Sequence, residues 1–218
     1  MRRSLVTSLI CGALLVPMLQ GCISLLAVGA TQATLAAVDR RALGTQTEDE
    51  SIEWKAALQI SPLGGRESHI NFTSYNGKVL ITGEVASEQT KAEVERLVAA
   101  LPEVRGVYNE LVVAPISSFG TRSNDSYLTT KVKSRFVEAG KFNPVYVKVV
   151  TENGVVYLLG LVTQREADAA IQLARTTSDV KKVVTLLEII TDARARELDA
   201  KAEPRPPANS PDTVVGGA

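Results

Sequence analysis

Cys22 has the clearest chemical role in this chain, because the residues before it form a cleavage site of the lipoprotein type. Leu19-Gln20-Gly21-Cys22 resembles a lipobox, in which a small residue precedes a cysteine that is acylated on its thiol. Gln20 departs from the small or apolar residue usual at its position. We predict that Cys22 begins the mature protein and carries a covalent diacylglycerol and an N-acyl chain such as palmitate, with no other cofactor. The alternative is an ordinary signal peptide with a chance cysteine.

The residues before Cys22 fit a leader. Arg2 and Arg3 precede an apolar run, Leu5 to Leu19, that is shorter than the roughly 20 residues needed to cross a bilayer. Cys11 lies in this leader, so Cys22 is the one cysteine expected to remain and no intrachain disulfide is possible. Three acyl chains anchor a protein stably, since two lipid signals already suffice. The leader resembles those of enteric lipoproteins, in which Asp after the cysteine retains the protein at the inner membrane. Ile23 stands at that position here, so the resemblance implies the outer membrane and a protein that faces the periplasm.

A second group of residues suits binding rather than catalysis. On a helical wheel from Asn124 to Lys141, Leu128, Val132 and Phe136 form an apolar stripe expected to face the core. The other side carries aromatic, hydroxyl and basic side chains: Tyr127, Thr130, Lys131, Lys133, Ser134, Val137 and Lys141. Arg122 to Lys148 holds 6 basic and 2 acidic residues, a net charge of +4. Two interpretations remain open, an ordinary solvated helix face or a surface that binds an anionic membrane.

Enzymatic chemistry has little support in the sequence. His69 is the only histidine, so no two-histidine metal site is possible, and we predict no metal. Gly64-Gly65 lacks the lysine and hydroxyl residue of a phosphate-binding loop. The acidic residues are dispersed along predicted helices. We therefore expect a protein that is not an enzyme, with no small-molecule substrate.

The elements that position these residues form an internal repeat about 76 residues apart. Ile70 to Val85 reads INFTSYNGKVLITGEV and Val147 to Val162 reads VKVVTENGVVYLLGLV. Asp49 aligns with Asp125 ahead of these strands. Each repeat predicts a helix (about 50–60 and 125–138), a hairpin, a second helix and a last strand (107–113 and 183–190). Imperfect alternation in the strands is typical of a sheet with one covered face.

The turns of this repeat have their own signals. Asn76-Gly77 and Asn153-Gly154 tolerate the positive φ angles of a tight hairpin. Gly83 and Gly160 occupy matching strand ends, where a backbone turns or packs closely. Thr163 to Glu166 fits a capping box at the start of a helix. The fold class is α+β, two tandem α-β-β-α-β units with helices on one face of a three-stranded mixed sheet.

Five segments follow from these patterns. They are a signal peptide (1–21), a lipidated tether (22–47), a first domain (48–115), a second domain (120–192) and a disordered tail (193–218) rich in Pro, Ala and charge. Glu48 to Val113 holds 6 basic and 11 acidic residues, net −5, whereas Arg122 to Thr191 holds 10 and 7, net +3. The acidic first repeat and the location disfavour nucleic-acid binding.

The repeat with its Asn-Gly hairpin and following glycine resembles the BON domain. Together with the lipobox and the stretches Val38 to Thr47, Ser123 to Lys133 and Thr151 to Ala167, it is similar to the dual BON-domain outer-membrane lipoproteins. The resemblance covers the chain from Cys22 to Thr191. The first repeat departs most, with Trp54 and Pro62 in its first helix.

The resemblance implies a role in keeping the outer membrane intact, with anionic phospholipid bound through the first helix of the second domain. It also implies gathering at division sites and contact with the barrel-assembly machinery. The family usually has Trp where this chain has Tyr127, a weaker interfacial anchor. The alternative function is a periplasmic adaptor that binds a protein of the barrel-assembly or cell-wall machinery.

Overall fold

The computed structural model describes residues 39–64 and 68–202. The predicted α+β class is confirmed, because two α-β-β-α-β units follow one another along the chain. The first unit contains α3 (Leu43–Gly64), β1 (His69–Tyr75), β2 (Lys78–Val85), α4 (Glu88–Ala99), β3 (Gly106–Asn109) and β4 (Val112–Val113). The second contains α5 (Phe119–Ala139), the short 3-10 helix η2 (Pro144–Tyr146), β5 (Val147–Glu152), β6 (Val155–Val162), α6 (Gln164–Arg175) and β7 (Lys182–Ile189), and α7 (Asp192–Ala202) follows it. Among the residues described, no helix is long and apolar enough to cross a bilayer.

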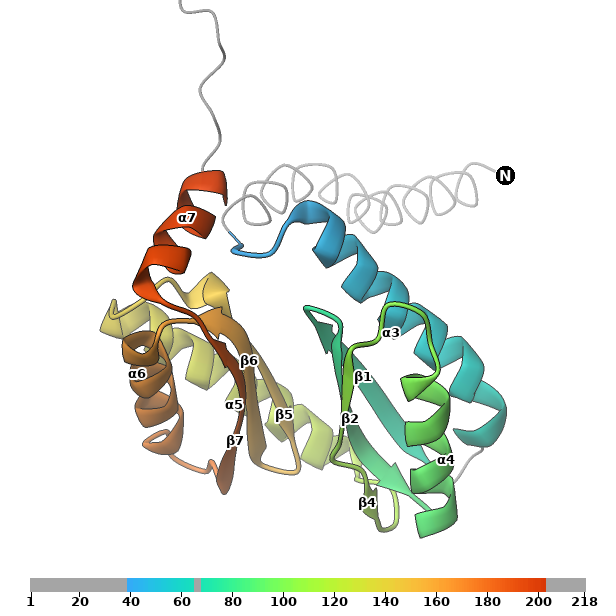
Figure 1. Ribbon diagram of the computed structural model, residues 1–218. Coiled ribbons are helices and arrows are strands. Elements are labelled where there is room, and N and C mark those ends of the chain that lie inside the picture. Colours follow the sequence, from blue (N-terminus) through green and yellow to red (C-terminus); the bar gives the residue numbers. More distant parts are fainter. Residues whose placement is uncertain (1–38, 65–67, 203–218) are drawn as a thin grey trace, which may run out of the picture. The chain divides into compact units, whose positions relative to one another are not determined.

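Both sheets are mixed, as expected. In the first sheet β1 pairs antiparallel with β2, whereas β3 and β4 both run parallel to β2. β3 and β4 together replace the single last strand predicted at 107–113, which is interrupted at Glu110 and Leu111. In the second sheet β6 lies between antiparallel β5 and parallel β7. In each unit both helices cover one face of the sheet (Figure 1).

The helix faces that pack on the sheets follow the helical period. The predicted stripe of Leu128, Val132 and Phe136 is confirmed, because all three side chains are fully buried. Phe136 packs edge-on against Phe142, with ring centroids 5.1 Å apart. In α3 the corresponding buried residues are Ile52, Ala56 and Ile60. The capping box of α6 is present, with reciprocal hydrogen bonds between Thr163 and Glu166.

The expectation of one covered sheet face is wrong. The faces without helices also carry buried apolar side chains, and these form one cluster across the two sheets: Tyr75, Leu80, Tyr157 and Leu159. Strands buried on both sides read as nearly continuous apolar runs, which explains the imperfect alternation. The two units therefore share a core in addition to their own cores.

Two predicted boundaries also need correction. The first helices begin earlier than expected, at Leu43 and Phe119, so residues 43–47 belong to the first domain's helix. The chain from Asp192 to Ala202 is helical where the sequence predicted a disordered tail. Ala195 in this helix is buried, and Asp199 accepts hydrogen bonds from Arg40. These distant partners stabilise a segment whose local composition gives no apolar pattern.

The glycines at the strand ends lie against backbone. Gly83 has φ +117°, and a Cβ atom there would overlap the carbonyl oxygen of His69. A Cβ atom on Gly160 would overlap the carbonyl oxygen of Tyr146. Any larger residue at either position must displace the neighbouring chain.

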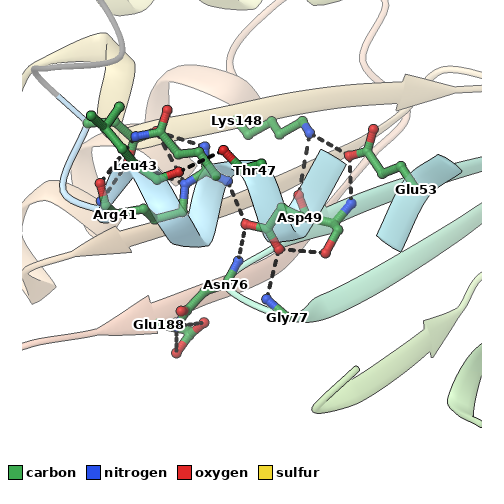
Figure 2. A network of polar contacts seen from close by, with 12 residues as sticks. Arg41, Leu43, Thr47, Asp49, Glu53, Asn76, Gly77, Lys148 and Glu188 are labelled. Carbon is green, nitrogen blue, oxygen red and sulfur yellow. Dashed lines mark hydrogen bonds and ion pairs between the residues drawn. The ribbon is translucent and has the colours of Figure 1, made fainter. Parts of the chain in front are cut away.

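A buried carboxylate on the first helix of each unit holds the hairpin turn. Asn76, Gly77, Asn153 and Gly154 all have positive φ, between 50° and 78°. Their backbone N–H groups point at an aspartate: Asn76 and Gly77 donate to Asp49, each over 2.8 Å (Figure 2). Asn153 and Gly154 donate to Asp125 over 2.9 and 2.8 Å. These are the aspartates that the repeat aligned.

We expect Asp125→Ala to lower the free energy of unfolding by about 2 to 4 kcal/mol, because two N–H groups lose their charged acceptor. Urea denaturation of the whole chain measures this change. Asp168→Ala, at an exposed site on α6, is the control and should change stability by less than about 0.5 kcal/mol. Equal effects of the two substitutions would show that the turn does not depend on Asp125.

Candidate membrane-binding surface

The helix α5 presents its polar and basic side to solvent. Ser118 caps its N-terminus by accepting a hydrogen bond from Thr121 N, and Gly140 ends it in the left-handed conformation with φ 56°. Asp125 and the buried stripe fix how the helix is rotated on the sheet. The side opposite the stripe is therefore directed away from the core by the same contacts that fold the unit.

Six of the seven residues predicted to bind phospholipid are exposed: Tyr127, Thr130, Lys133, Ser134, Val137 and Lys141. Tyr127 is 61% exposed and Val137 is 66% exposed, which is high for apolar side chains of this size. Cys22, the predicted lipidation site, lies outside the described residues.

Lys131 differs from the other six because its charge is already engaged. Its ammonium group donates to Ser178 and lies 3.1 Å from the carboxylate of Asp179. It also lies 5.7 Å from the centroid of the Tyr127 ring. Lys131 is half-buried by these contacts and holds α5 to the loop after α6. Its contribution to an anionic surface is therefore smaller than the helical wheel implied.

The other basic residues of this region divide into two groups. The first group already has hydrogen-bond partners. Arg122 donates to Ser117, and Arg135 donates to Leu173 and Thr177. Lys148 donates to Glu53 and Ser74. For Lys133 and Lys141 no ion pair or hydrogen bond is found within residues 39–64 and 68–202. These two exposed lysines supply the available positive charge on this side of α5.

A groove of about 640 Å³ runs beside the C-terminal half of α5. One wall is formed by Thr130, Lys133, Ser134 and Val137, and the opposite wall includes Pro144 and Val145. The structure thus gathers four of the seven predicted residues around one hollow. Tyr127, Lys131 and Lys141 do not line it.

Arg41 and Tyr75 close the groove from the first unit. The Arg41 guanidinium lies 4.0 Å from the centroid of the Tyr75 ring and pairs with Asp39 at 2.7 Å. It also pairs with Asp49 at 2.8 Å (Figure 2). Burial lowers the pKa of Arg41, but its bonds to Asp39 and Asp49 outweigh this and raise the pKa above its ordinary value. Arg41 is therefore a permanently charged structural residue whose charge is neutralised locally.

Sequence reasoning missed two exposed apolar features. Phe119, the first residue of α5, is 78% exposed and lies on the side of Tyr127 and Val137. On α3, Trp54 is 67% exposed and Leu58 lies beside it one turn later. Trp54 lies within the predicted helix at about 50–60, so a helical wheel of that segment would have found it. Phe119 precedes the predicted helix at 125–138, and only the longer helix α5 includes it.

Charge distinguishes the two helices. α3 contains Glu48, Asp49, Glu50 and Glu53 against one lysine, a net charge of −3, whereas α5 has four basic and two acidic residues, net +2. The two helices therefore differ in sign of charge, and any anionic surface would favour α5 over α3.

Comparison with known proteins gives one family. The model of the BON domain matches residues 55–115 and 124–191. The outer membrane lipoprotein DolP of Haemophilus influenzae is 41% identical over 174 residues, covering 79% of this chain and 90% of that protein. A 21 kDa hemolysin of Actinobacillus pleuropneumoniae is 35% identical over 155 residues, covering 70% of this chain and 80% of its own. Among solved structures, CdsD, a structural protein of the type III secretion system of Chlamydia trachomatis, covers 71% of this chain and 97% of its own at 14% identity and a TM-score of 0.29.

We expect Tyr127→Glu to leave the melting temperature unchanged, because the side chain is exposed. Val132→Glu should unfold the protein, because it places an unpaired charge among fully buried apolar side chains. Circular dichroism during heating measures both. The reverse outcome would mean that α5 is rotated relative to its sheet.

Proposed function

The chain belongs to the BON-domain family, and we propose that it keeps the outer membrane intact by binding anionic phospholipid through α5 of its second domain. Like the relative named above, it is an outer-membrane lipoprotein. The proposal gives the protein no catalytic step. Gathering at division sites and contact with the barrel-assembly machinery stay predictions.

One observation carries the proposal. Phe119, Tyr127 and Val137 expose apolar surface along one side of α5, and the unpaired lysines Lys133 and Lys141 flank it. Aromatic side chains with a polar tip suit the headgroup region of a bilayer, and lysines beside them suit anionic headgroups. Glu138 is exposed on the same helix and opposes the attraction.

The expected strength of this contact is modest. Each basic residue close to an anionic surface contributes about 1 kcal/mol, so the two unpaired lysines contribute about 2 kcal/mol. A lipid anchor at Cys22 would keep the domain near the surface, so a weak contact would be sufficient to orient it. The anchor would hold the protein at the membrane, and α5 would determine which side of the second domain faces the bilayer.

A protein-binding function is the second candidate, and α3 favours it. Trp54 and Leu58 expose apolar surface on a helix with a net charge of −3, which an anionic membrane would repel. Tryptophan is enriched at the centres of protein interfaces. A basic or neutral protein partner would fit this surface better than phospholipid.

The anchor is tested by Cys22→Ala, which should release the protein from membrane fractions and abolish palmitate labelling. The reason is that acylation requires the thiol of Cys22. Fractionation of cells expressing the variant measures the release. If the variant stays in the outer membrane and still labels with palmitate, the anchor lies elsewhere.

Phospholipid binding is tested with residues 23–218 and anionic liposomes in a co-sedimentation assay. The whole chain is used because separated domains would expose the shared cluster around Tyr75 and Tyr157. Lys133→Glu should weaken binding roughly 30-fold, since charge reversal costs about 2 kcal/mol, and salt should screen this effect. Tyr127→Glu should also lose binding, and Tyr127→Trp should strengthen it.

The matched control is Trp54→Glu, which makes the same kind of change on α3. It should leave liposome binding within about twofold of the unmodified chain, because α3 does not face the membrane in this proposal. If Trp54→Glu abolishes binding while Lys133→Glu and Tyr127→Glu do not, the membrane contact is α3. If no variant changes binding, protein binding becomes the better proposal.

A further inference from the structure

The only histidine of the chain lies between two buried carboxylates. His69 and Glu84 are paired residues on β1 and β2, and Glu152 ends β5 in the second unit. The Nδ1 atom of His69 lies 3.3 Å from Glu84 Oε2 and 3.9 Å from Glu152 Oε1. One nitrogen and two carboxylate oxygens, one from each residue, all lie within 4.8 Å of one another.

The two carboxylates are held firmly in place. Glu84 is 2% exposed and accepts hydrogen bonds from Asn153 Nδ2 over 2.5 Å and from Ser117 N and Oγ, each over 3.2 Å. Glu152 is 8% exposed and accepts from Asn71 Nδ2 over 3.1 Å. Both side chains are therefore oriented toward His69 by neighbours on other elements.

Positive charge is scarce around this pair. Burial raises the pKa of Glu152, and the nearby carboxylate of Glu84 acts in the same direction. Arg122 borders the hollow in front of Glu152, but its guanidinium donates to the carbonyl oxygen of Ser117. The repeat contains an equivalent contact, in which Asn76 donates to Glu188 as Asn153 donates to Glu84. Glu188 differs from Glu84 because a lysine, Lys78, lies 3.4 Å from its carboxylate.

A hydrogen bond explains only part of this geometry. His69 Nδ1 lies within hydrogen-bonding distance of Glu84 Oε2, at 3.3 Å, but it carries at most one proton and leaves Glu152 Oε1, 3.9 Å away, without a bond from the ring. The 3.3 Å separation is also close to the distance between two ligands of a tetrahedral Zn²⁺ ion with bonds of roughly 2.0 to 2.1 Å. Glu152 Oε1, at 3.9 Å from Nδ1, would have to move closer when the ion binds.

We propose that His69, Glu84 and Glu152 form a binding site for a divalent transition-metal ion, with Zn²⁺ the best match. Imidazole nitrogen with carboxylate oxygen suits Zn²⁺, whereas Mg²⁺ and Ca²⁺ prefer oxygen ligands alone. His69 and Glu152 border a hollow of about 370 Å³ that is also lined by Asn71, Thr129 and Thr151, and a water molecule there would supply the fourth ligand.

The Asn71 amide supports the site from the second layer. Its Nδ2 donates to Glu152 Oε2, which leaves Oε1, the oxygen 3.9 Å from His69 Nδ1, for the metal.

The site would join the two domains. Glu84 belongs to the first unit and Glu152 to the second, so one ion would cross-link β2 to β5. The prediction of no metal rested on the lack of a second histidine, which rules out two-histidine sites but not a site with one histidine and two carboxylates. Residues 69, 84 and 152 lie too far apart in the sequence to form a recognisable metal-binding motif. Metal binding would therefore stabilise the relative placement of the two BON domains.

The test uses the untagged full-length mature protein in detergent, stripped of metal with a chelator. Calorimetric titration should show one Zn²⁺ per chain and no binding of Mg²⁺ at the same concentration. The single imidazole signal in the NMR spectrum should shift with Zn²⁺, since His69 is the only histidine. Absence of one-to-one binding, or an imidazole signal that does not move, would overturn the proposal without any variant.

Substitutions locate the ion. His69→Gln and Glu152→Gln should each weaken Zn²⁺ binding tenfold or more, because even loss of a second-layer partner has effects of about 10- to 100-fold. Glu188→Gln is the matched control at the other junction contact and should bind Zn²⁺ like the unmodified protein. Melting in chelator checks that each variant folds. Unchanged binding by a folded His69→Gln protein would also overturn the proposal.

Discussion

The aspartate on the first helix of each unit is the contact on which the remaining structure depends. Asp49 and Asp125 each accept two backbone N–H groups from a turn whose residues have positive φ. A turn of this kind points consecutive N–H groups inward, and burial makes an unpaired group costly. The aspartate carboxylate accepts hydrogen bonds from these N–H groups, which removes the cost of burying them and holds the hairpin against the helix. The rotation of the helix is thereby set, and with it the side that faces solvent.

The same turn joins the two units. Because the aspartates take the backbone N–H groups, the side-chain amides of Asn76 and Asn153 are available to donate elsewhere. Each donates to a glutamate of the other unit, Glu188 and Glu84 respectively. The open faces of the sheets meet in the cluster that contains Tyr75 and Tyr157. Closing one hairpin and docking the two domains are therefore linked, which gives Asn at this position a second role beyond its tolerance of positive φ.

Local patterns predicted the features that depend on nearby residues, and failed where partners are distant. The repeat, the Asn-Gly turns and the stripe of Leu128, Val132 and Phe136 were readable because period and spacing encode them. The helix from Asp192 to Ala202 was not, because Arg40 reaches both Glu166 and Asp199 across more than a hundred residues. The wheel placed Tyr127 and Val137 correctly in solvent, but it could not show that Lys131 pairs with Asp179. Pairing of this kind depends on a loop that the wheel does not include.

The first helices of the two units, α3 and α5, pack on their sheets in the same way but differ in the charge of their exposed sides. Both begin with an exposed apolar residue, Leu43 or Phe119, and both bury an aspartate at the same offset. Packing therefore constrains one side of each helix and leaves the other free to vary. On α5 that side combines apolar surface with unpaired lysines, whereas on α3 it combines Trp54 with acidic residues. An anionic surface attracts the first combination and repels the second, so two copies of one fold present chemically different helix faces, and the proposed division between a lipid-facing and a protein-facing helix rests on this difference.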